Sequence, residues 1–342
     1  MKNIKNQKKN NFFKKIFIKL CRMLGFEIID QSNFFFPVSN KNSTQNLSEL
    51  GKKSISVALG ETKITRAVKS LTIIIKTCTS VNLVTQNKKR VFENKKSEYT
   101  FRTINSLLKS LKKTSENTKN IKFHITVIDT GSSANDKEKM KEILRKSNFE
   151  FNLIDLNLKD YLERIKVIKK NNSQIENNMK STMASIIKSF EISKNLNDLV
   201  YFVEDDYIHD VDCISEMISA YEKFSTIFED EIFIVPVDYP YLYQKNNSTS
   251  ILMGQKYHWR SVKESLLTFL TDKKMINKYY EDLIKMGEIE QEPYETILHS
   301  IYDKENCFSP VPSLALHCTN VNSVFGLSPT IDFKKLWEDS KM

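Results

Sequence analysis

The amino-acid sequence predicts an α/β protein in which helices flank a mainly parallel mixed sheet. Runs rich in β-branched and aromatic residues, the composition of buried strands, occur at positions 71–78, 121–129, 150–156 and 199–203. Helix-forming segments separate these runs, and strands that alternate with helices form parallel βαβ units. Acidic residues end or directly follow two of the runs, at the sheet edge where open α/β proteins bind their ligands.

The first half of the chain has a regular order of predicted elements. The run 71–78 has the density of β-branched side chains that is typical of a central strand. The run 121–129 ends at Asp129 and is closed by a polar turn that contains Gly131. We expect the helices between the strands at residues 99–113, 136–146 and 181–190.

The second half of the chain is less regular. A strand is expected at residues 231–236, ended by Asp238-Tyr239-Pro240, and a last apolar segment leads to His317. Pro293 suits the first turn of a helix, because the N–H that proline lacks has no partner there. We expect helices at residues 213–224, 263–270, 274–286 and 293–302.

Residues 1–69 form a basic N-terminal extension ahead of the main domain, residues 70–342. Between positions 11 and 26, apolar residues recur at helical spacing and basic residues occupy other faces. The apolar residues are Phe13, Ile16, Phe17, Leu20 and Leu24, and the basic ones are Lys14, Lys15, Lys19 and Arg22. This pattern predicts an amphipathic helix on an anionic membrane surface, too often interrupted by lysine to span the membrane. A helix packed on the protein core would show the same spacing. Residues 33–65 are expected to be an irregular lead-in.

The charge of the chain is concentrated near its N-terminus. Residues 1–120 contain 25 Lys and Arg against 7 Asp and Glu, whereas the rest of the chain is acidic. A basic segment favours a nucleic acid or an anionic membrane as partner, although an AT-rich coding sequence would also enrich lysine. The five cysteines show no metal-binding or disulfide spacing, and no secretion signal is visible. We therefore expect a cytoplasmic protein, peripheral on the inner face of the membrane.

The triplet Glu204-Asp205-Asp206 is the strongest functional signal in the sequence, because it follows a five-residue apolar strand. Adjacent carboxylates repel one another, and a divalent cation such as Mg²⁺ or Mn²⁺ would neutralise them. Such an ion commonly completes its coordination with substrate phosphates. Two other interpretations stay open: a solvated acidic loop, or a turn in which Asp210 or Asp212 caps the next helix.

Together with this triplet, four further segments occur in a recognisable order along residues 70–328. The chain resembles nucleotide-sugar glycosyltransferases of the GT-A fold, broadly those similar to family 2. The resemblance implies a Rossmann-like, nucleotide-binding half at 70–210 and an acceptor-side half at 211–342. The four segments are Thr77-Cys78, Val127-Ile128-Asp129-Thr130-Gly131-Ser132, Glu290–Glu295 and Pro312-Ser313-Leu314-Ala315-Leu316-His317.

The resemblance implies a role for each of these segments. Glu204, Asp206 and His317 would hold Mn²⁺ or Mg²⁺, and Asp205 would contact the ribose or a metal-bound water. Nucleotide base and ribose contacts would come from Thr77, Cys78 and Asp129. An inverting transfer also needs a general base, for which Glu292 and Glu295 fit the acidic position before a helix better than Glu290 does. A solvated, charged helix face would explain these glutamates equally well.

His258-Trp259-Arg260 is a further candidate segment. Tryptophan stacks on sugar rings and arginine binds phosphate in a bidentate manner, so Arg260 could contact the donor diphosphate. Core packing of Trp259 beside a surface arginine is the simpler alternative. Asp238 and Tyr239 are candidates of the same kind, with core packing as the simpler alternative.

These observations favour a metal-dependent transferase, of the hexosyl or N-acetylhexosaminyl type, that uses a nucleoside-diphosphate sugar. Uridine diphosphate is the default nucleotide by resemblance, and a glycan or a lipid-linked molecule is the expected acceptor. A nucleotidyltransferase is the alternative enzyme, but Gly51 and Gly60 do not form a phosphate-binding loop. A basic nucleic-acid-binding protein or a scaffold is the non-enzymatic alternative, and no nucleic-acid-binding motif supports the first. The donor sugar and the stereochemistry stay open.

Overall fold

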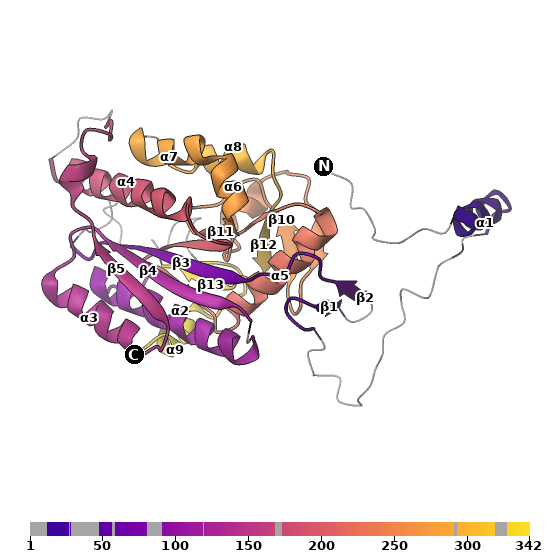
Figure 1. The fold of residues 1–342 in the computed structure, drawn as a ribbon, viewed down its shortest axis with the longest axis horizontal. Helices are drawn as coiled ribbons and strands as arrows, with labels where there is room; N and C mark the ends of the chain where they lie inside the picture. Colours follow the sequence, from indigo (N-terminus) through magenta and orange to yellow (C-terminus); the bar gives the residue numbers. More distant parts are fainter. Residues whose placement is uncertain are drawn as a thin grey trace.

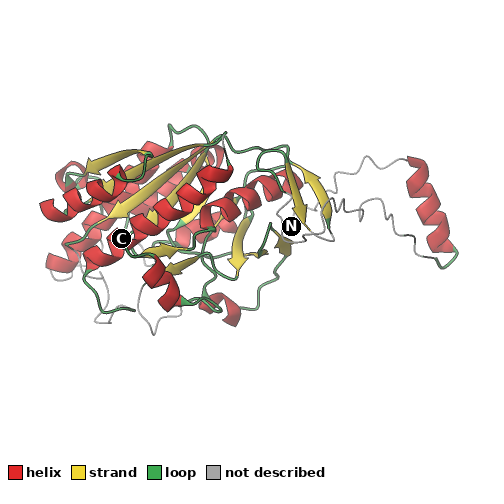
Figure 2. Ribbon diagram, turned by 90° about the horizontal axis from the view of Figure 1, so that it is seen from below, coloured by secondary structure: helices red, strands yellow, loops and turns green. Residues whose placement is uncertain are grey.

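The computed structural model describes residues 12–26, 28, 48–56, 59–80, 91–118, 120–167, 173–290, 293–318 and 327–342. Its centre is a sheet of nine strands in the order β5-β4-β3-β6-β11-β8-β12-β10-β9. Helices lie on both faces of this sheet (Figures 1 and 2), with α4, α6, α7 and α8 above it and α2, α3 and α9 below it in Figure 1. The predicted α/β architecture, a mixed sheet flanked by helices, is confirmed.

The first half of the sheet is entirely parallel, as predicted. In register, Thr77 lies opposite Asp129 and Lys76 opposite Glu204, so the ends of neighbouring strands meet at one edge. The strands are β3 (Ser70–Thr77), β4 (Lys122–Asp129), β5 (Glu150–Asp155) and β6 (Leu199–Glu204). The helices between them are α2 (Lys96–Asn117), α3 (Ala134–Arg145) and α4 (Ser173–Ser193).

The second half of the sheet is mixed. Its strands are β11 (Phe269–Asp272), β8 (Phe233–Ile234), β12 (Cys307–Val311), β10 (His258–Ser261) and β9 (Ile251–Met253). β11 is antiparallel to both β6 and β8, so β8 and its parallel neighbour β12 run in the direction of β6. Its helices are α5 (Cys213–Phe228), α6 (Lys273–Lys278), α7 (Tyr280–Glu288), α8 (Thr296–Tyr302) and α9 (Phe333–Asp339). β7 (Tyr207–His209) and β13 (Ala315–His317) form a separate antiparallel pair.

Two helix predictions in this half need correction. The predicted helix at 263–270 is wrong, since this segment is irregular until it enters β11, where Leu270 pairs with both Tyr201 and Ile234. A short apolar run suits a buried strand as well as a buried helix, and here the sheet takes it. The predicted helix at 274–286 is two helices, because the backbone at Tyr279 leaves helical geometry at φ −112° and ψ 17°.

The expected irregular lead-in contains an antiparallel hairpin, β1 (Lys53–Ser56) paired with β2 (Gly60–Lys63). The hairpin belongs to the compact part of the chain. The amide of Gly51 donates to Glu222 at 2.7 Å, and the Lys223 ammonium donates both to Ser56 at 2.5 Å and to the carbonyl oxygen of Met253 at 2.7 Å. Its two four-residue strands lack an alternating apolar pattern, so the sequence carries no strand signal there.

The basic N-terminal extension contains the predicted helix, α1 (Phe12–Met23). Its apolar side chains face solvent: Phe13 is 76% exposed, Phe17 57% and Leu20 54%. Figure 1 shows α1 as the first helix of the chain. None of the helices in the described part of the chain is long and apolar enough to cross a bilayer.

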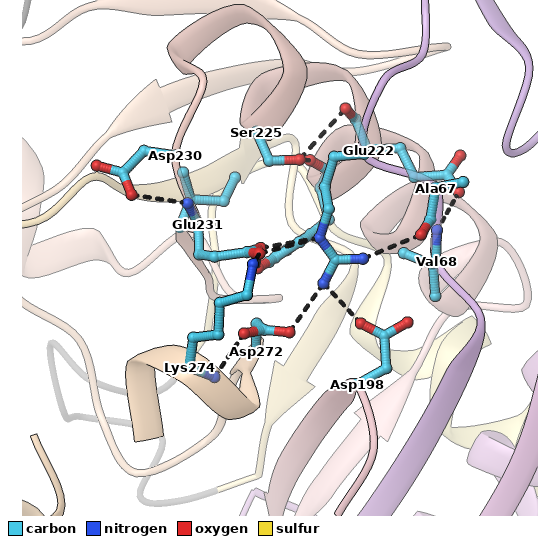
Figure 3. A network of polar contacts seen from close by, with 12 residues as sticks. Ala67, Val68, Asp198, Glu222, Ser225, Asp230, Glu231, Asp272 and Lys274 are labelled. Atoms are coloured by element: carbon cyan, nitrogen blue, oxygen red, sulfur yellow. Dashed lines mark hydrogen bonds and ion pairs between the residues drawn. The ribbon is translucent and has the colours of Figure 1, made fainter. Parts of the chain in front are cut away.

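A buried charge cluster around Arg66 fastens the amino-terminal ends of the strands (Figure 3). Nη2 of Arg66 donates to Asp198 at 2.6 Å and to Asp272 at 2.8 Å, and Nε donates to Glu231 at 3.0 Å. Asp198 precedes β6, Asp272 ends the antiparallel β11 and Glu231 precedes β8. The arginine thus joins three neighbouring strands at the amino edge of the sheet.

Further donors support this cluster. Tyr221 and Lys274 donate to the Glu231 carboxylate at 2.6 Å and 2.9 Å. Burial alone would raise the pKa of Glu231, but these hydrogen bonds and the charge of Arg66 lower it. Burial would also lower the pKa of Arg66, whereas its bond to Asp198 and the neighbouring carboxylates raise it. Arg66 and Glu231 therefore both keep their charge at neutral pH.

Candidate active site

The candidate site lies at the carboxyl edge of the sheet, opposite the Arg66 cluster. β3, β4, β6, β8 and β12 run in one direction, so the residues that follow them meet at this edge. Glu204 ends β6, and Asp205 and Asp206 form the turn into β7. Open α/β sheets bind ligands at this position.

Asp206 and His317 lie together at this edge. β7 and β13 pair so that His317 stands opposite Tyr207, and the amide of Cys318 donates to the carbonyl oxygen of Asp206 at 2.8 Å. This pairing places the imidazole Nε2 of His317 3.7 Å from the carboxylate Oδ1 of Asp206. The sequence predicted both residues as metal ligands, and the structure brings them side by side.

Two buried tyrosines support the imidazole of His317. The ring of Tyr207 stacks on it, with centroids 4.5 Å apart and planes 11° from parallel. The ring of Tyr239 meets it edge-on at 6.3 Å, and the two tyrosine hydroxyls are 2.7 Å apart. Burial raises the pKa of both tyrosines well above the usual value, so both hydroxyls stay protonated. The histidine ring is thus held between fixed neutral groups.

Glu204 faces a lysine on the neighbouring strand. Lys76 is its register partner in β3, and the ammonium Nζ lies 3.7 Å from Oε1 of Glu204. The backbone amide of Glu204 donates to the Thr268 hydroxyl at 3.2 Å. Glu204 therefore has an internal counter-charge, whereas the sequence analysis assigned it to the metal.

Asp205 is the most enclosed member of the triplet. Its Oδ2 accepts hydrogen bonds from the Cys78 amide at 3.1 Å and from the Thr100 hydroxyl at 2.8 Å. Its Oδ1 accepts one from the ammonium of Lys96, the first residue of α2. The three carboxylates of the triplet thus differ in environment, and two of them pair with lysines.

Glu295 is the predicted base that the structure places beside this cluster. It is half-buried and stands immediately before α8. Burial, and next the charge of Glu204, raise its pKa to about 7, while its own amide and Lys76 oppose the rise. Glu292 lies outside the described residues. Glu290 is buried, and its amide donates to the carbonyl oxygen of Lys166 at 3.0 Å.

The nucleotide-side candidates Thr77, Cys78 and Asp129 occupy the ends of β3 and β4. The Asp129 carboxylate accepts hydrogen bonds from the Thr77 hydroxyl at 2.8 Å and from the amide of Ser132 at 3.0 Å. Asp129 is fully buried, and burial raises its pKa despite these bonds. The Cys78 thiol donates to the carbonyl oxygen of Thr130 at 2.7 Å. These contacts join the two strand ends into one rigid edge.

The His258-Trp259-Arg260 segment forms β10. Trp259 is fully buried, so it packs in the core and cannot stack on a sugar; this corrects the sugar-stacking interpretation. Arg260 donates to Asp238 at 2.5 Å, and its guanidinium lies 4.2 Å from the centre of the Tyr243 ring. Asp238 follows β8 and precedes Tyr239, so Arg260 lies near the candidate site but already has an anionic partner.

The donor set fits a divalent cation only in part. Among the residues that the structure describes, no three His, Cys, Asp or Glu side chains gather closely enough to hold a metal ion. The predicted trio is therefore not assembled, because Glu204 faces Lys76. Asp206 and His317 fit as a pair, since ligand atoms lie about 2 Å from Mg²⁺ and two atoms 3.7 Å apart can reach one ion. Substrate phosphates and water would supply the remaining ligands.

Several residues that contact the candidate site were not predicted from the sequence. Lys76 carried a readable signal, as the one charged residue within the apolar strand 71–77. Lys96 and Thr100 carried none, because a helix with mixed charges does not show which side chains turn toward a strand end. Tyr207 follows the triplet directly and could have been proposed for its position alone.

No protein-family model and no curated protein matches the sequence. Among solved structures, the galactosyltransferase LgtC in complex with donor and acceptor sugar analogues is similar over 68% of this chain and 70% of its own, at 13% identity and a TM-score of 0.37. Mouse xyloside xylosyltransferase 1 is similar over 68% and 76%, at 11% identity and a TM-score of 0.36. The bifunctional glycosyltransferase WbbM is similar over 67% and 37%, at 9% identity and a TM-score of 0.35. These scores describe a distant likeness.

Proposed function

We propose that this protein is a metal-dependent glycosyltransferase, which moves a sugar from a nucleoside diphosphate to a glycan or a lipid-linked acceptor. The observation that carries the proposal is the pairing of Asp206 with His317 at the carboxyl edge, beside Glu295. There the donor diphosphate would meet the cation, and the acceptor hydroxyl would meet a general base. The default donor is a uridine-diphosphate hexose or N-acetylhexosamine, as the sequence resemblance implies.

Asp206 and His317 would bind the cation from one side and leave its other positions to the donor diphosphate. Imidazole favours Mn²⁺ over Mg²⁺. A bound ion would supply charge stabilisation to the departing nucleoside diphosphate. Tyr207 and Tyr239 fix the orientation of the His317 ring, which a partial coordination site requires because the protein contributes few ligands.

Glu295 would accept the proton of the acceptor hydroxyl at its carboxylate. A base works best when its pKa is close to the working pH, and burial brings the pKa of Glu295 to about 7. Lys76 faces Glu204 and so limits the negative charge around Glu295. The three residues together would keep a half-buried carboxylate able to gain and lose a proton near neutral pH.

The exposed apolar side of α1 supports a peripheral membrane position on the cytoplasmic face. Phe13, Phe17 and Leu20 are exposed on this helix, and its sequence is rich in lysine. Apolar insertion and attraction to anionic lipids would act together. Such a position would bring the site to lipid-linked or membrane-bound acceptors.

The test of the proposed function is the thermal stability of the purified chain against a panel of nucleotides, with and without Mn²⁺. A ligand that binds only the folded state raises Tm in proportion to occupancy. A Mn²⁺-dependent rise with one nucleoside diphosphate, followed by sugar release or transfer from the matching donor, is the expected result. A folded sample whose Tm responds to no nucleotide would contradict the proposal.

A further inference from the structure

Asp205 joins three elements that meet at the carboxyl edge. It follows β6, and it accepts hydrogen bonds from the amide of Cys78, directly after β3, and from the side chains of Lys96 and Thr100 in the first two turns of α2. Lys96 and Thr100 are four residues apart, so they lie on one face of the helix. A single carboxylate therefore holds the end of β3 and the start of α2 against the end of β6.

Asp205 belongs to a buried ion pair. Asp205 is 7% exposed, and the Lys96 side chain that it pairs with is only 12% exposed. Both oxygens of the carboxylate already accept hydrogen bonds from the protein. A buried ammonium that lost its carboxylate would be strongly destabilising. Separation of Asp205 from Lys96 would cost free energy, so we expect the ion pair to stay intact when a ligand binds.

We propose that Asp205 is a positioning residue, which acts through Lys96 and Thr100 to fix the start of α2 against the end of β3, and does not itself contact the donor or the cation. This inference rests on the proposed function and deepens it. The three carboxylates of the triplet then have separate roles. Asp206 faces His317, and Glu204 faces Lys76. Asp205 holds together the end of β3, the end of β6 and the start of α2, which we call the frame.

The frame matters because Thr77 and Cys78, the predicted nucleotide contacts, are part of it. The amide of Cys78 is held by Asp205, and the Thr77 hydroxyl is held by Asp129. Loss of the Asp205 contacts should therefore weaken donor binding while leaving the response to metal in place.

The experiment is a double-mutant cycle between Asp205→Asn and Lys96→Met, read by the Kd of the donor nucleotide in Mn²⁺. We expect each single variant to weaken nucleotide binding by about tenfold, the effect of losing one charge-assisted hydrogen bond. The double variant should be no weaker than either single one, because both remove the same contact. KM for the donor should rise with little change in kcat.

A second readout follows the frame without any ligand. Hydrogen exchange of the amides at residues 97–104 should speed up in Asp205→Asn and in Lys96→Met, and stay unchanged in Asp206→Asn. Thr100→Val should reproduce part of the effect, whereas Thr100→Ser, which keeps the hydroxyl, should exchange like the wild type. The two Thr100 variants also provide the test if Asp205→Asn fails to fold. The exchange measurement stands even if the wild-type chain binds no nucleotide, so failure of the proposed function is recognised separately.

Three results would overturn the inference. One is unchanged exchange at 97–104 in Asp205→Asn. Another is a loss of the Mn²⁺ response in Asp205→Asn as complete as in Asp206→Asn, which would make Asp205 a ligand of the cation. Additive effects of Asp205→Asn and Lys96→Met on the Kd would likewise show that Asp205 acts independently of Lys96.

Discussion

The imidazole Nε2 of His317 stands 3.7 Å from the carboxylate Oδ1 of Asp206, although the two residues lie far apart in the sequence. The short antiparallel pair β7–β13 creates this proximity, because its register sets His317 against Tyr207, the residue after Asp206. An acid and a histidine thus converge through backbone pairing, and their spacing suits a shared cation.

Asp206→Asn and His317→Gln should each remove the Mn²⁺-dependent part of the Tm rise that a nucleoside diphosphate produces. Either change would remove one of the two ligands that the proposal assigns within the described part of the chain, so we expect the metal to bind about tenfold or more weakly, a loss of about 1.4 kcal/mol or more. Asp155→Asn is the matched control, since Asp155 ends β5 at the same edge but pairs with Lys137. An unchanged Mn²⁺ response in both site variants would exclude the pair as the metal site.

Glu295→Gln should lower kcat by about 10² to 10⁴, the usual contribution of a general base. In the wild-type protein, kcat should rise with pH through about 7 and level off above it, because only the deprotonated carboxylate accepts a proton and its pKa is about 7. The variant should lose this inflection. Glu281→Gln, an exposed position on α7, is the control. A wild-type inflection that persists in Glu295→Gln would assign the base elsewhere.

Arg66→Met should destabilise the fold by about 3 kcal/mol or more, because Asp198 and Asp272 would stay buried without their counter-charge. Urea unfolding followed by circular dichroism measures the change. Arg145→Met is the control, since the Arg145–Glu138 pair is 60% exposed on both sides and should contribute less than about 1 kcal/mol. Equal losses in the two variants would show that the Arg66 cluster adds no particular stability.

Glu216→Gln should be more stable than the wild type at pH 8, and this advantage should be smaller at pH 5. Glu216 is 1% exposed, and burial raises its pKa from 4.5 to about 7. The folded state keeps the proton up to about pH 7 and the unfolded state loses it near 4.5, so the wild type loses stability as pH rises between these values. The variant should avoid a loss of about 2 to 3 kcal/mol. The exposed Glu142→Gln is the control, and a pH-independent difference between Glu216→Gln and the wild type would contradict the expectation.

Replacement of Phe13, Phe17 and Leu20 by serine should reduce binding to phosphatidylserine vesicles in a sedimentation assay. Each buried CH₂ group contributes about 0.8 kcal/mol to membrane partitioning, so the triple change should abolish most of the binding. Ile251→Ser removes an apolar side chain that is exposed on the edge strand β9 and serves as control. Binding that is equal for wild type and triple variant would remove α1 from the membrane proposal.

The parallel half of the fold could be predicted from the sequence because its signals are local. β3, β4 and β6 are long apolar runs. α2 and α3 begin and end within four residues of the expected positions, whereas α4 begins at Ser173 and not at residue 181. The other half could not, since β8 has two residues, β9 has three, and β10 and β11 pair with strands far away in the sequence. The segment 263–270 shows the limit, because its apolar residues fit either secondary structure until Leu270 meets Ile234.

The candidate site divides in the same way. The triplet and His317 could be named because each follows a recognisable strand-like run. The separate roles within the triplet could not be predicted, since they depend on Lys76 and Lys96, whose side chains reach Glu204 and Asp205 only in the folded chain. Glu295 could be proposed as an acid near a helix start, but its pKa near 7 arises from burial and from Glu204.

The position of the Arg66 cluster at the amino edge has a consequence for laboratory evolution. The residues that hold the strands together and the residues that we propose bind the substrate occupy opposite ends of the same strands. Libraries aimed at the proposed site therefore leave the Arg66 cluster untouched, provided that they spare the buried side chains after β8 and β12, such as Val237, Tyr239 and Leu314. Heat-sensitive alleles, by contrast, should be sought among Arg66, Asp198 and Glu231.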